Sequence, residues 1–343
     1  MLFKLIICYY SMNIIRLTDK KTQKFIYKNK SSKKRMNDPK TLERIKSLKI
    51  PPAYTNVIIS NDPNSKVQSI GTDTKKRKQY TYHPNHIETQ SKLKFEDLIY
   101  FGKKIKRIRK DINTNIEKCS KNIDLLYNKE SIISIILYLI DYCNFRVGCE
   151  KYKKLYNSFG VTTLNNSHIK FNKNNAIIEF IGKKGVKNSH KVTKYSVCSL
   201  LKTLCSNDTD YLFYYIDSKN QHYRINEKHI NDYLKKYHKT LTVKMFRTWN
   251  ANYILLKELL NLDLPDSESN AKKNISIAIK KAASQMHHTA NVSKKSYMNS
   301  EIVDLYRTNP LKFKRLIEFF RKTNGNLPTI GRLLNLLLTN INT

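Results

Sequence analysis

The sequence predicts an α+β protein. A small β-rich amino-terminal domain should precede a larger, mostly helical domain that contains a β-hairpin or three-stranded sheet. Short runs rich in β-branched and aromatic residues, bounded by turn residues, occur between residues 57 and 82 and again between 168 and 198. Apolar residues at helical spacing fill most of the chain beyond residue 117. The 343 residues are enough for two domains. We therefore expect an extension over 1–36, the β-rich domain over 37–117 and the larger domain over 118–343.

Prolines and turn residues define the elements of the first two parts. The apolar run 2–15 is interrupted by Lys4 and has no small-residue cleavage site. It is weak as a signal peptide and too short to span a bilayer, but it could form a strand. Asp38 and Pro39 give the N-cap and first position of a short helix. The two prolines within 50–54 require an extended chain. Strands are expected at 57–60, 67–73 and 78–82, and a helix with a basic exposed face at 94–116.

The larger domain is predicted to begin with a buried helix at 131–145, which is apolar on several faces and is followed directly by Arg146. Alternating residues then predict three strands and a lysine-rich hairpin tip between the last two, with the strands at 168–171, 176–182 and 190–197 and the tip at 183–188. The rest of the chain is predicted to be mainly helical, including helices at 246–260 and 273–286.

The charge of the chain indicates a polyanionic partner. The formal net charge is +37, from 64 Lys and Arg against 27 Asp and Glu. A field of this size attracts polyanions, of which nucleic acid is the first candidate and an anionic membrane surface the second. The basic residues are spread along most of the chain, which favours a groove that encloses nucleic acid over a membrane-bound patch. We therefore expect nucleic acid as the partner, and no membrane.

No metal or cofactor is expected. The six cysteines form no CxxC pair and no cluster at zinc spacing, so we interpret them as reduced thiols of an intracellular protein. The chain also has no G-x-x-x-x-G-K-[ST] loop for nucleotide phosphates and no dense carboxylate cluster for magnesium.

Five widely spaced residues suggest one reaction, the attack on a phosphodiester without a metal: Arg146, Lys183, Arg247, His288 and Tyr297. A phenol is a nucleophile, two guanidiniums and an imidazole can stabilise a negatively charged phosphorane, and an ammonium can protonate a leaving oxygen. Each residue alone also has a structural explanation, such as an ion pair for Arg146, a solvated turn for Lys183 or one of 22 structural tyrosines for Tyr297.

The residues around these five form ordered strings. In the larger domain they are FRVGCEKYKKLYNSFGVTTLNNSHIKF (145–171), IEFIGKKGVKNSH (178–190), KMFRTWNANY (244–253) and HHTANVSKKSYM (287–298), and earlier in the chain IPPAYTNVIIS (50–60) and GTDTKKRKQYTYHP (71–84). The first four resemble the catalytic domain of type IB DNA topoisomerases, the poxvirus, bacterial and nuclear family. The last two resemble the amino-terminal part of bacterial and giant-virus members.

The resemblance implies the fold that this family shares with tyrosine recombinases, and it implies roles for the five residues. Tyr297 would be the nucleophile, and Arg146, Lys183, Arg247 and His288 would assist it. A monomer would clamp the duplex and form a 3′-phosphotyrosyl link. The cut strand would swivel, relax supercoils of either sign without ATP or metal, and be rejoined. DNA contacts are expected from Lys78, Tyr80, Tyr82, Tyr152 and Lys184.

Two alternatives remain at this stage. A tyrosine recombinase shares the catalytic set, but Lys244 stands three residues before Arg247, where recombinases commonly carry histidine. A non-enzymatic DNA-packaging protein would explain the charge but not the ordered residues. The Lys-, Asn- and Ile-rich composition resembles that of AT-rich genomes. Together with the mixed likeness to poxvirus and bacterial members, this composition suggests a large DNA virus, with the protein acting in the virion or a host-cell compartment.

Overall fold

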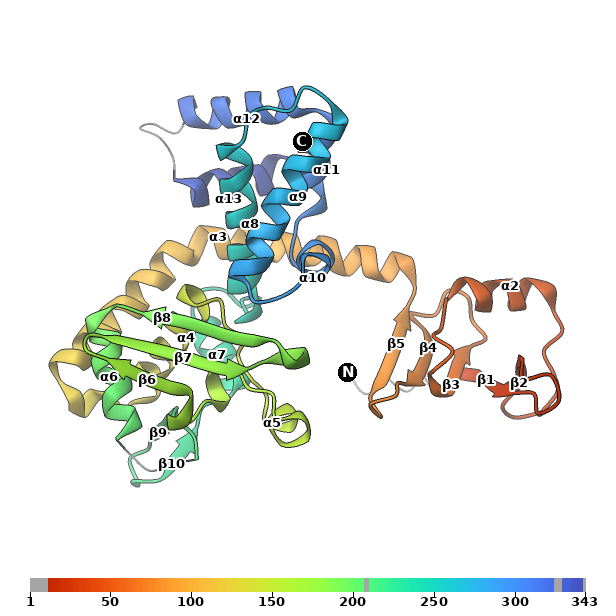
Figure 1. The fold of residues 1–343 in the computed structure, drawn as a ribbon, viewed down its shortest axis with the longest axis horizontal. Helices are drawn as coiled ribbons and strands as arrows, with labels where there is room; N and C mark the ends of the chain where they lie inside the picture. Colours follow the sequence, from red (N-terminus) through yellow and green to blue (C-terminus); the bar gives the residue numbers. More distant parts are fainter. Residues whose placement is uncertain (1–11, 207–209, 324–328, 342–343) are drawn as a thin grey trace. The chain divides into compact units, whose positions relative to one another are not determined.

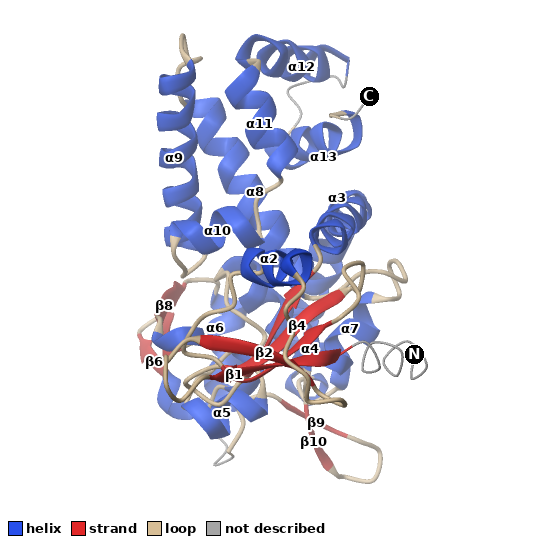
Figure 2. Ribbon diagram, turned by 90° about the vertical axis from the view of Figure 1, so that its right-hand side faces the viewer, coloured by secondary structure: helices blue, strands red, loops and turns tan. Residues whose placement is uncertain are grey.

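The computed structural model describes residues 12–206, 210–323 and 329–341 (Figures 1 and 2). The interpretation of the apolar run 2–15 therefore lies, for residues 2–11, outside the described residues. The chain divides into two compact units, Met1–Lys94 and Phe95–Thr343. The division falls inside the long helix α3, Pro84–Lys121, which also includes the predicted domain boundary at residue 117.

A five-stranded antiparallel sheet forms the first unit, in the order β2-β1-β3-β4-β5. Its strands are β1 (Met12–Thr18), β2 (Phe25–Asn29), β3 (Thr55–Ser60), β4 (Val67–Thr72) and β5 (Lys78–Tyr82), and its helix is α2 (Pro39–Ser47). The three predicted strands and the predicted helix are present. The described part of the 1–36 extension adds β1 and β2, so it belongs to the sheet.

Alternation of apolar and polar residues gives this sheet one buried face. Ile14, Val57 and Ile59 pack with Ile45 of α2 in a small core. Asp38 caps α2 by accepting a hydrogen bond from the Thr41 backbone N–H at 2.9 Å, as the sequence predicts. The core is small, so the unit also depends on such polar contacts to hold α2 and the loops against the sheet.

The second unit contains a three-stranded antiparallel sheet, a two-stranded hairpin and most of the helices. The sheet consists of β6 (Ile169–Asn172), β7 (Asn175–Ile181) and β8 (Lys187–Val192), and the hairpin of β9 (Tyr214–Ile216) and β10 (His222–Arg224). The helices are α4 (Lys129–Tyr142), α5 (Glu150–Tyr156), α6 (Tyr195–Cys205), α7 (Glu227–Leu234), α8 (Lys244–Asn261), α9 (Glu268–Gln285), α10 (Ala290–Ser296), α11 (Ser300–Thr308), α12 (Pro310–Thr323) and α13 (Ile330–Asn340). Helices α8, α9, α11, α12 and α13 pack together at the end of this unit opposite the sheet (Figures 1 and 2).

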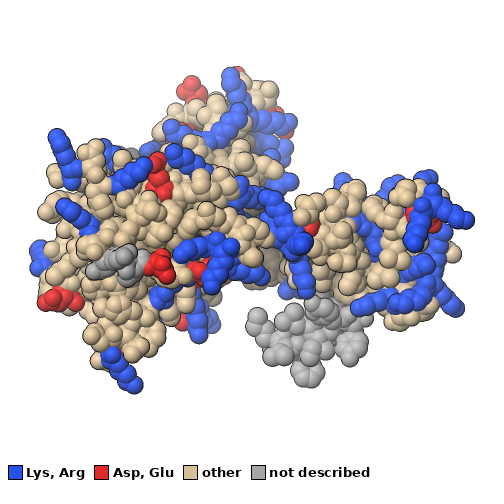
Figure 3. Space-filling view, turned by 60° about the horizontal axis from the view of Figure 1, so that its bottom comes forward, with Lys and Arg blue, Asp and Glu red and all other residues tan. Residues whose placement is uncertain are grey.

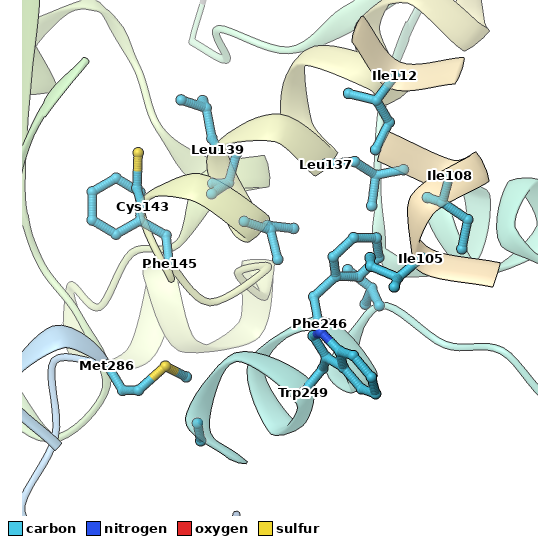
Figure 4. Close-up of a cluster of buried hydrophobic side chains, with 14 of the residues drawn as sticks. Ile105, Ile108, Ile112, Leu137, Leu139, Cys143, Phe145, Phe246, Trp249 and Met286 are labelled. Atoms are coloured by element: carbon cyan, nitrogen blue, oxygen red, sulfur yellow. The ribbon is translucent and has the colours of Figure 1, made fainter. Parts of the chain in front are cut away.

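One apolar core runs through the second unit (Figure 4). Helix α3 buries a stripe at three- and four-residue spacing that includes Phe101, Ile105 and Ile108. Phe246 and Trp249 of α8 pack against this stripe, and the Phe101 and Phe246 rings meet edge to face with centroids 4.9 Å apart. Helix α4 also packs against α8 and is buried on almost every side, as its largely apolar sequence predicts. This core fixes α8, the helix on which the candidate site is built.

Two predicted boundaries in this unit are wrong. The expected strand 190–197 ends at Val192, and α6 begins at Tyr195. Buried residues at helical spacing (Val197, Leu200, Leu201 and Leu204) start there and outweigh the short alternation before them. The expected helix 131–145 ends at Tyr142. Asn144 has a left-handed backbone (φ 56°), which no helix residue can adopt, so Arg146 lies in a loop rather than at the end of a helix.

In the part of the chain that the structure describes, no helix is both long enough and apolar enough to cross a membrane.

Gly102 of α3 provides a test of this packing. A Cβ atom at residue 102 would lie 2.6 Å from the Trp249 ring, whereas one at Gly331 of α13 would lie 3.7 Å from it. Alanine in a helix gains about 1 kcal/mol over glycine, but overpacking a rigid core costs about 1–3 kcal/mol. We expect Gly102→Ala to lower the melting temperature, measured by circular dichroism, and the matched Gly331→Ala to leave it unchanged or raise it. A Gly102→Ala protein that melts at or above the wild-type temperature would contradict this packing.

Candidate active site

Three of the five predicted residues, Arg146, Arg247 and His288, meet around the phenol of a fourth, Tyr297. Arg146 Nη1 donates a hydrogen bond to Tyr297 Oη at 2.8 Å. The Arg247 guanidinium carbon lies 5.5 Å from the centroid of the Tyr297 ring. The His288 ring stacks on the Tyr297 ring, with centroids 4.8 Å apart and planes 13° apart. Residues up to 151 positions apart in the sequence therefore share one site.

Arg146 lies in the loop between α4 and α5 and is held by residues 160–162, which follow α5. Its carbonyl accepts a hydrogen bond from Val161 N at 2.9 Å, and Thr162 N donates to the next carbonyl, that of Val147, at 2.7 Å. This close approach requires Gly160, because a Cβ at that position would lie 2.7 Å from the Arg146 carbonyl oxygen. The backbone of Arg146 is thus fixed, and its guanidinium points at the phenol.

Arg247 is a buried cation on α8, only 5% exposed. Its Nη2 donates to the Met286 carbonyl at 2.8 Å and contacts His288 Nδ1 at 3.3 Å. Burial, together with the charge of Arg146, lowers the pKa of Arg247 to about 10, so it remains charged at neutral pH. Among the described residues its Nε has no hydrogen-bond partner. A buried, charged donor without a partner indicates a place for an anion.

His288 presents a second donor to the same place. A guanidinium can only donate, so His288 Nδ1 accepts from Arg247, and Nε2 carries the proton of the neutral ring. Burial and the nearby guanidiniums of Arg247 and Arg146 lower the pKa of His288 to about 4, which keeps the ring neutral. Its Nε2 is also buried without a partner in the described part of the chain.

His287, the neighbouring histidine, faces elsewhere. It has a left-handed backbone (φ 53°), and its Nε2 donates to the Cys143 carbonyl at 3.1 Å. Its ring packs near that of Phe145, with centroids 5.6 Å apart. The geometry therefore distinguishes His288, which faces the phenol, from His287, which ties the backbone before Arg146 to the residues after α9.

The two arginines tune the phenol itself. Burial alone would raise the pKa of Tyr297, but the charges of Arg247 and Arg146 and their hydrogen bonds outweigh burial and lower it. A lower pKa makes the phenolate, which is the nucleophilic form, more available.

Asn252 on α8 is a buried residue at the site that the sequence analysis missed. Its Nδ2 donates to the Tyr297 carbonyl at 2.8 Å, and its Oδ1 accepts from Asn299 N at 2.8 Å. It is fully buried and so fixes the backbone at Tyr297 and directly after it. The available signal was an amide on the apolar face of a helix, where it needs partners.

The other predicted residues lie outside this cluster of contacts. Lys183 and Lys184 are exposed at the tip between β7 and β8, where Gly182 N donates to the Val186 carbonyl at 2.8 Å and closes the turn. The remaining predicted DNA contacts are exposed in both units: Lys78, Tyr80 and Tyr82 on one face of the edge strand β5, with the two tyrosine rings stacked, and Tyr152 on α5, stacked on Tyr156. Their roles stay predictions.

Most of the charged side chains on the surface in view in Figure 3 are Lys or Arg. No group of three or more His, Cys, Asp or Glu side chains among the described residues could hold a metal ion.

Comparison with known proteins agrees with this geometry. The family model for the catalytic core of eukaryotic DNA topoisomerase I matches residues 75–321, and that for the amino-terminal domain of bacterial DNA topoisomerase IB matches residues 24–73. The chain is 35% identical over 300 residues to DNA topoisomerase 1B of Acanthamoeba polyphaga mimivirus, covering 85% of this chain and 87% of that protein. It is 25% identical over 297 residues to DNA topoisomerase 1B of Vaccinia virus (strain Copenhagen), covering 84% and 87%.

A phenol between two guanidiniums, on a fold of a small sheet unit and a larger helical unit, is an arrangement suited to nucleophilic attack on a phosphodiester. The chain belongs to the type IB DNA topoisomerase family, and its activity is that of a type I DNA topoisomerase, an isomerase. The predicted family and fold are confirmed, and the recombinase alternative is not favoured. The viral relatives indicate a protein of a large DNA virus.

The pKa of Tyr297 can be measured directly. We expect the ¹³Cζ resonance of Tyr297, assigned by its loss in Tyr297→Phe, to titrate below the ordinary tyrosine value of about 10. Arg146→Ala should move this titration to higher pH, because it removes one of the charges that favour the phenolate. The control variant Lys280→Ala, which removes an exposed charge on α9, should leave the titration of Tyr297 unchanged. A Tyr297 signal that titrates at or above the ordinary value in the wild type would rule out this electrostatic effect.

Proposed function

We propose that Tyr297 is the nucleophile that cuts one strand of duplex DNA. Its oxygen forms a bond to a backbone phosphorus, the bond from that phosphorus to the 5′ oxygen breaks, and a 3′-phosphotyrosyl link results. The phenol proton leaves to solvent as the attack proceeds. The observation that carries this proposal is the 2.8 Å hydrogen bond from Arg146 to Tyr297 Oη, inside a cluster with two further donors that have no partner among the described residues.

Arg146, Arg247 and His288 would stabilise the phosphorane. The two guanidiniums supply positive charge and paired N–H donors, which match phosphoryl oxygens. His288 supplies a neutral N–H donor from Nε2. Donors held in place before the reaction lower the barrier because they need no reorganisation as charge develops.

Lys183 would protonate the leaving 5′ oxygen. It is exposed on a hairpin tip, next to Lys184, so a DNA strand can reach it. The proton taken from Lys183 appears on the 5′ hydroxyl, and religation returns it when that oxygen attacks the phosphotyrosine.

Rotation of the cut strand between cleavage and religation would relax supercoils of either sign. The phosphotyrosine conserves the energy of the phosphodiester bond, so the cycle balances without ATP, and every step uses side chains of this chain rather than a metal ion. We further propose that the protein works as a monomer that clamps double-stranded DNA in a virion or host-cell compartment. Residues 37–117 would act as the clamp and 118–343 as the catalytic domain.

DNA contacts outside the cluster are proposed on the basis of exposure and chemistry. Tyr80, Tyr82 and Lys78 share one exposed face of β5, where two stacked rings and a cation can contact bases and phosphates. Tyr152, 46% exposed on α5, is a second aromatic contact. Lys184 would join Lys183 at the scissile strand.

Tyr297→Phe tests the nucleophile. The variant loses one oxygen, so it should fold and bind DNA as the wild type does but form no covalent adduct. Relaxation of supercoiled plasmid in the presence of EDTA should proceed with wild-type protein and stop with Tyr297→Phe. Residual relaxation by this variant would sink the assignment. Strand exchange between paired sites, without relaxation, would point to a recombinase, and DNA binding without any change in linking number to a packaging protein.

His288 variants test the neutral donor. Loss of one such donor typically slows an enzyme about 10²–10³-fold, so His288→Ala should slow single-turnover cleavage by about that factor. His288→Gln keeps an N–H donor and should recover part of the rate. Because the pKa of His288 is lowered to about 4, the wild-type rate should show no loss between pH 8 and 6 from protonation of this ring. A histidine titration in that range, absent in His288→Gln, would contradict the neutral role.

A further inference from the structure

Helix α8 buries the polar side chain of Asn250 as well as those of Arg247, Thr248 and Asn252. Asn250 is only 8% exposed. Its Nδ2 donates to the Asp141 carbonyl at 2.8 Å and to Asn144 Oδ1 at 2.9 Å. Its Oδ1 accepts from Arg109 Nη2 at 3.3 Å. One buried amide thus uses both ends to join α8 to α3 and to the end of α4.

Asp141 is held in turn from α3. Arg109 Nε donates to Asp141 Oδ2 at 2.7 Å, and Arg109 Nη2 donates to Asp141 Oδ1 at 2.9 Å. Such a two-point contact fixes the carboxylate in rotation as well as in distance. Asn250, Asp141 and Arg109 therefore form a closed network in which each member restricts the other two.

This network acts on the turn that leads to Arg146. Asn144, which Asn250 holds by its side chain, has a left-handed backbone with φ 56° and lies two residues before Arg146. The carbonyl of Cys143, the residue before Asn144, accepts a hydrogen bond from His287 Nε2 at 3.1 Å. The chain is therefore fixed at three successive points, Asp141, Cys143 and Asn144, as it turns from α4 toward the phenol.

We propose that Asn250 is a positioning residue for Arg146. By holding Asn144 and the Asp141 carbonyl, it sets the turn that presents the Arg146 guanidinium to the scissile phosphate. Asn250 itself touches neither Tyr297 nor any of the other reacting groups named above. This inference rests on the proposed role of Arg146 in cleavage. Displacing a catalytic group by about 1 Å can cost about 10²-fold in rate, so a support of this kind matters although it does no chemistry.

The experiment compares Asn250→Ala in two backgrounds. Single-turnover formation of the covalent adduct is measured on a nicked duplex that traps it, with DNA affinity and the melting temperature measured in parallel. In the wild-type background we expect a fall of about 10- to 100-fold at unchanged DNA affinity. In the Arg146→Ala background the same change should cost less than about 2-fold, because residues that act through one group are not additive.

The controls separate a positioning role from a structural one. Asn274→Ala removes an amide of α9 that bonds the Asp263 carbonyl and Tyr306 Oη, each at 3.0 Å, and should leave the cleavage rate unchanged. Asn144→Gly keeps the left-handed backbone but removes the bond to Asn250, and should slow cleavage only when Arg146 is present. This variant also provides the test if Asn250→Ala does not fold.

Two outcomes would overturn the inference. One is the same fold-loss from Asn250→Ala, or from Asn144→Gly if the first does not fold, with and without Arg146. The other is no loss in the wild-type background. Failure of the proposed function is a separate result, because Arg146→Ala alone would then cleave at the wild-type rate.

Discussion

The site depends on holding two guanidiniums beside one phenol in a place where they repel each other. Arg247 is almost fully buried, and no carboxylate among the described residues forms an ion pair with it. Removing a charge from water is costly unless it gains a partner of opposite sign. Here the burial lowers the stability of the folded chain, and Arg247 Nε and His288 Nε2 have no hydrogen-bond partner among the described residues. The site is therefore complementary to an anion that arrives later, and most of all to a phosphorane, which carries more charge than the ground-state diester.

Helix α8 holds the charged and polar side chains of the site in fixed relative positions. Its Phe246 and Trp249 are locked into the core shared with α3 (Figure 4), so the helix is a rigid reference. Arg247, Asn250 and Asn252 extend from it to three different loops. These loops carry His288, Arg146 and Tyr297. The relative position of the proposed catalytic groups is thus set by spacing along one helix, which is more precise than packing of loops on loops.

The sequence predicted the strongly periodic parts of the fold and the residues that meet at Tyr297, but not the contacts that hold them in place. Helices such as α4 and α8 have unambiguous apolar patterns, and the five ordered residues are compatible with few reactions. The predicted end of α4 was wrong because the chain makes a left-handed turn at Asn144. The side chain of Asn144 accepts a hydrogen bond there from Asn250, which lies 106 residues away in the sequence. The strand predicted through residue 197 was wrong because the helical spacing of the buried residues of α6 begins soon after the alternating residues of β8 end. The hydrogen-bond partners of a buried amide cannot be predicted from its neighbours in the sequence. The contacts of Asn250 and Asn252 are therefore evident only from the structure.

The neutral state of His288 follows from the same charges that activate Tyr297. Arg247 and Arg146 disfavour a third cation, which lowers the pKa of His288, and favour an anion, which lowers the pKa of Tyr297. A lysine in place of His288 would add a charge to a pocket that already contains two, and would gain a phosphate contact only at the cost of greater repulsion in the free enzyme. A neutral imidazole adds a directed donor without that cost. Its Nδ1 also accepts from Arg247, so it orients the guanidinium that perturbs it. Two arginines and one neutral histidine are therefore a more stable way to supply several donors than three cations would be.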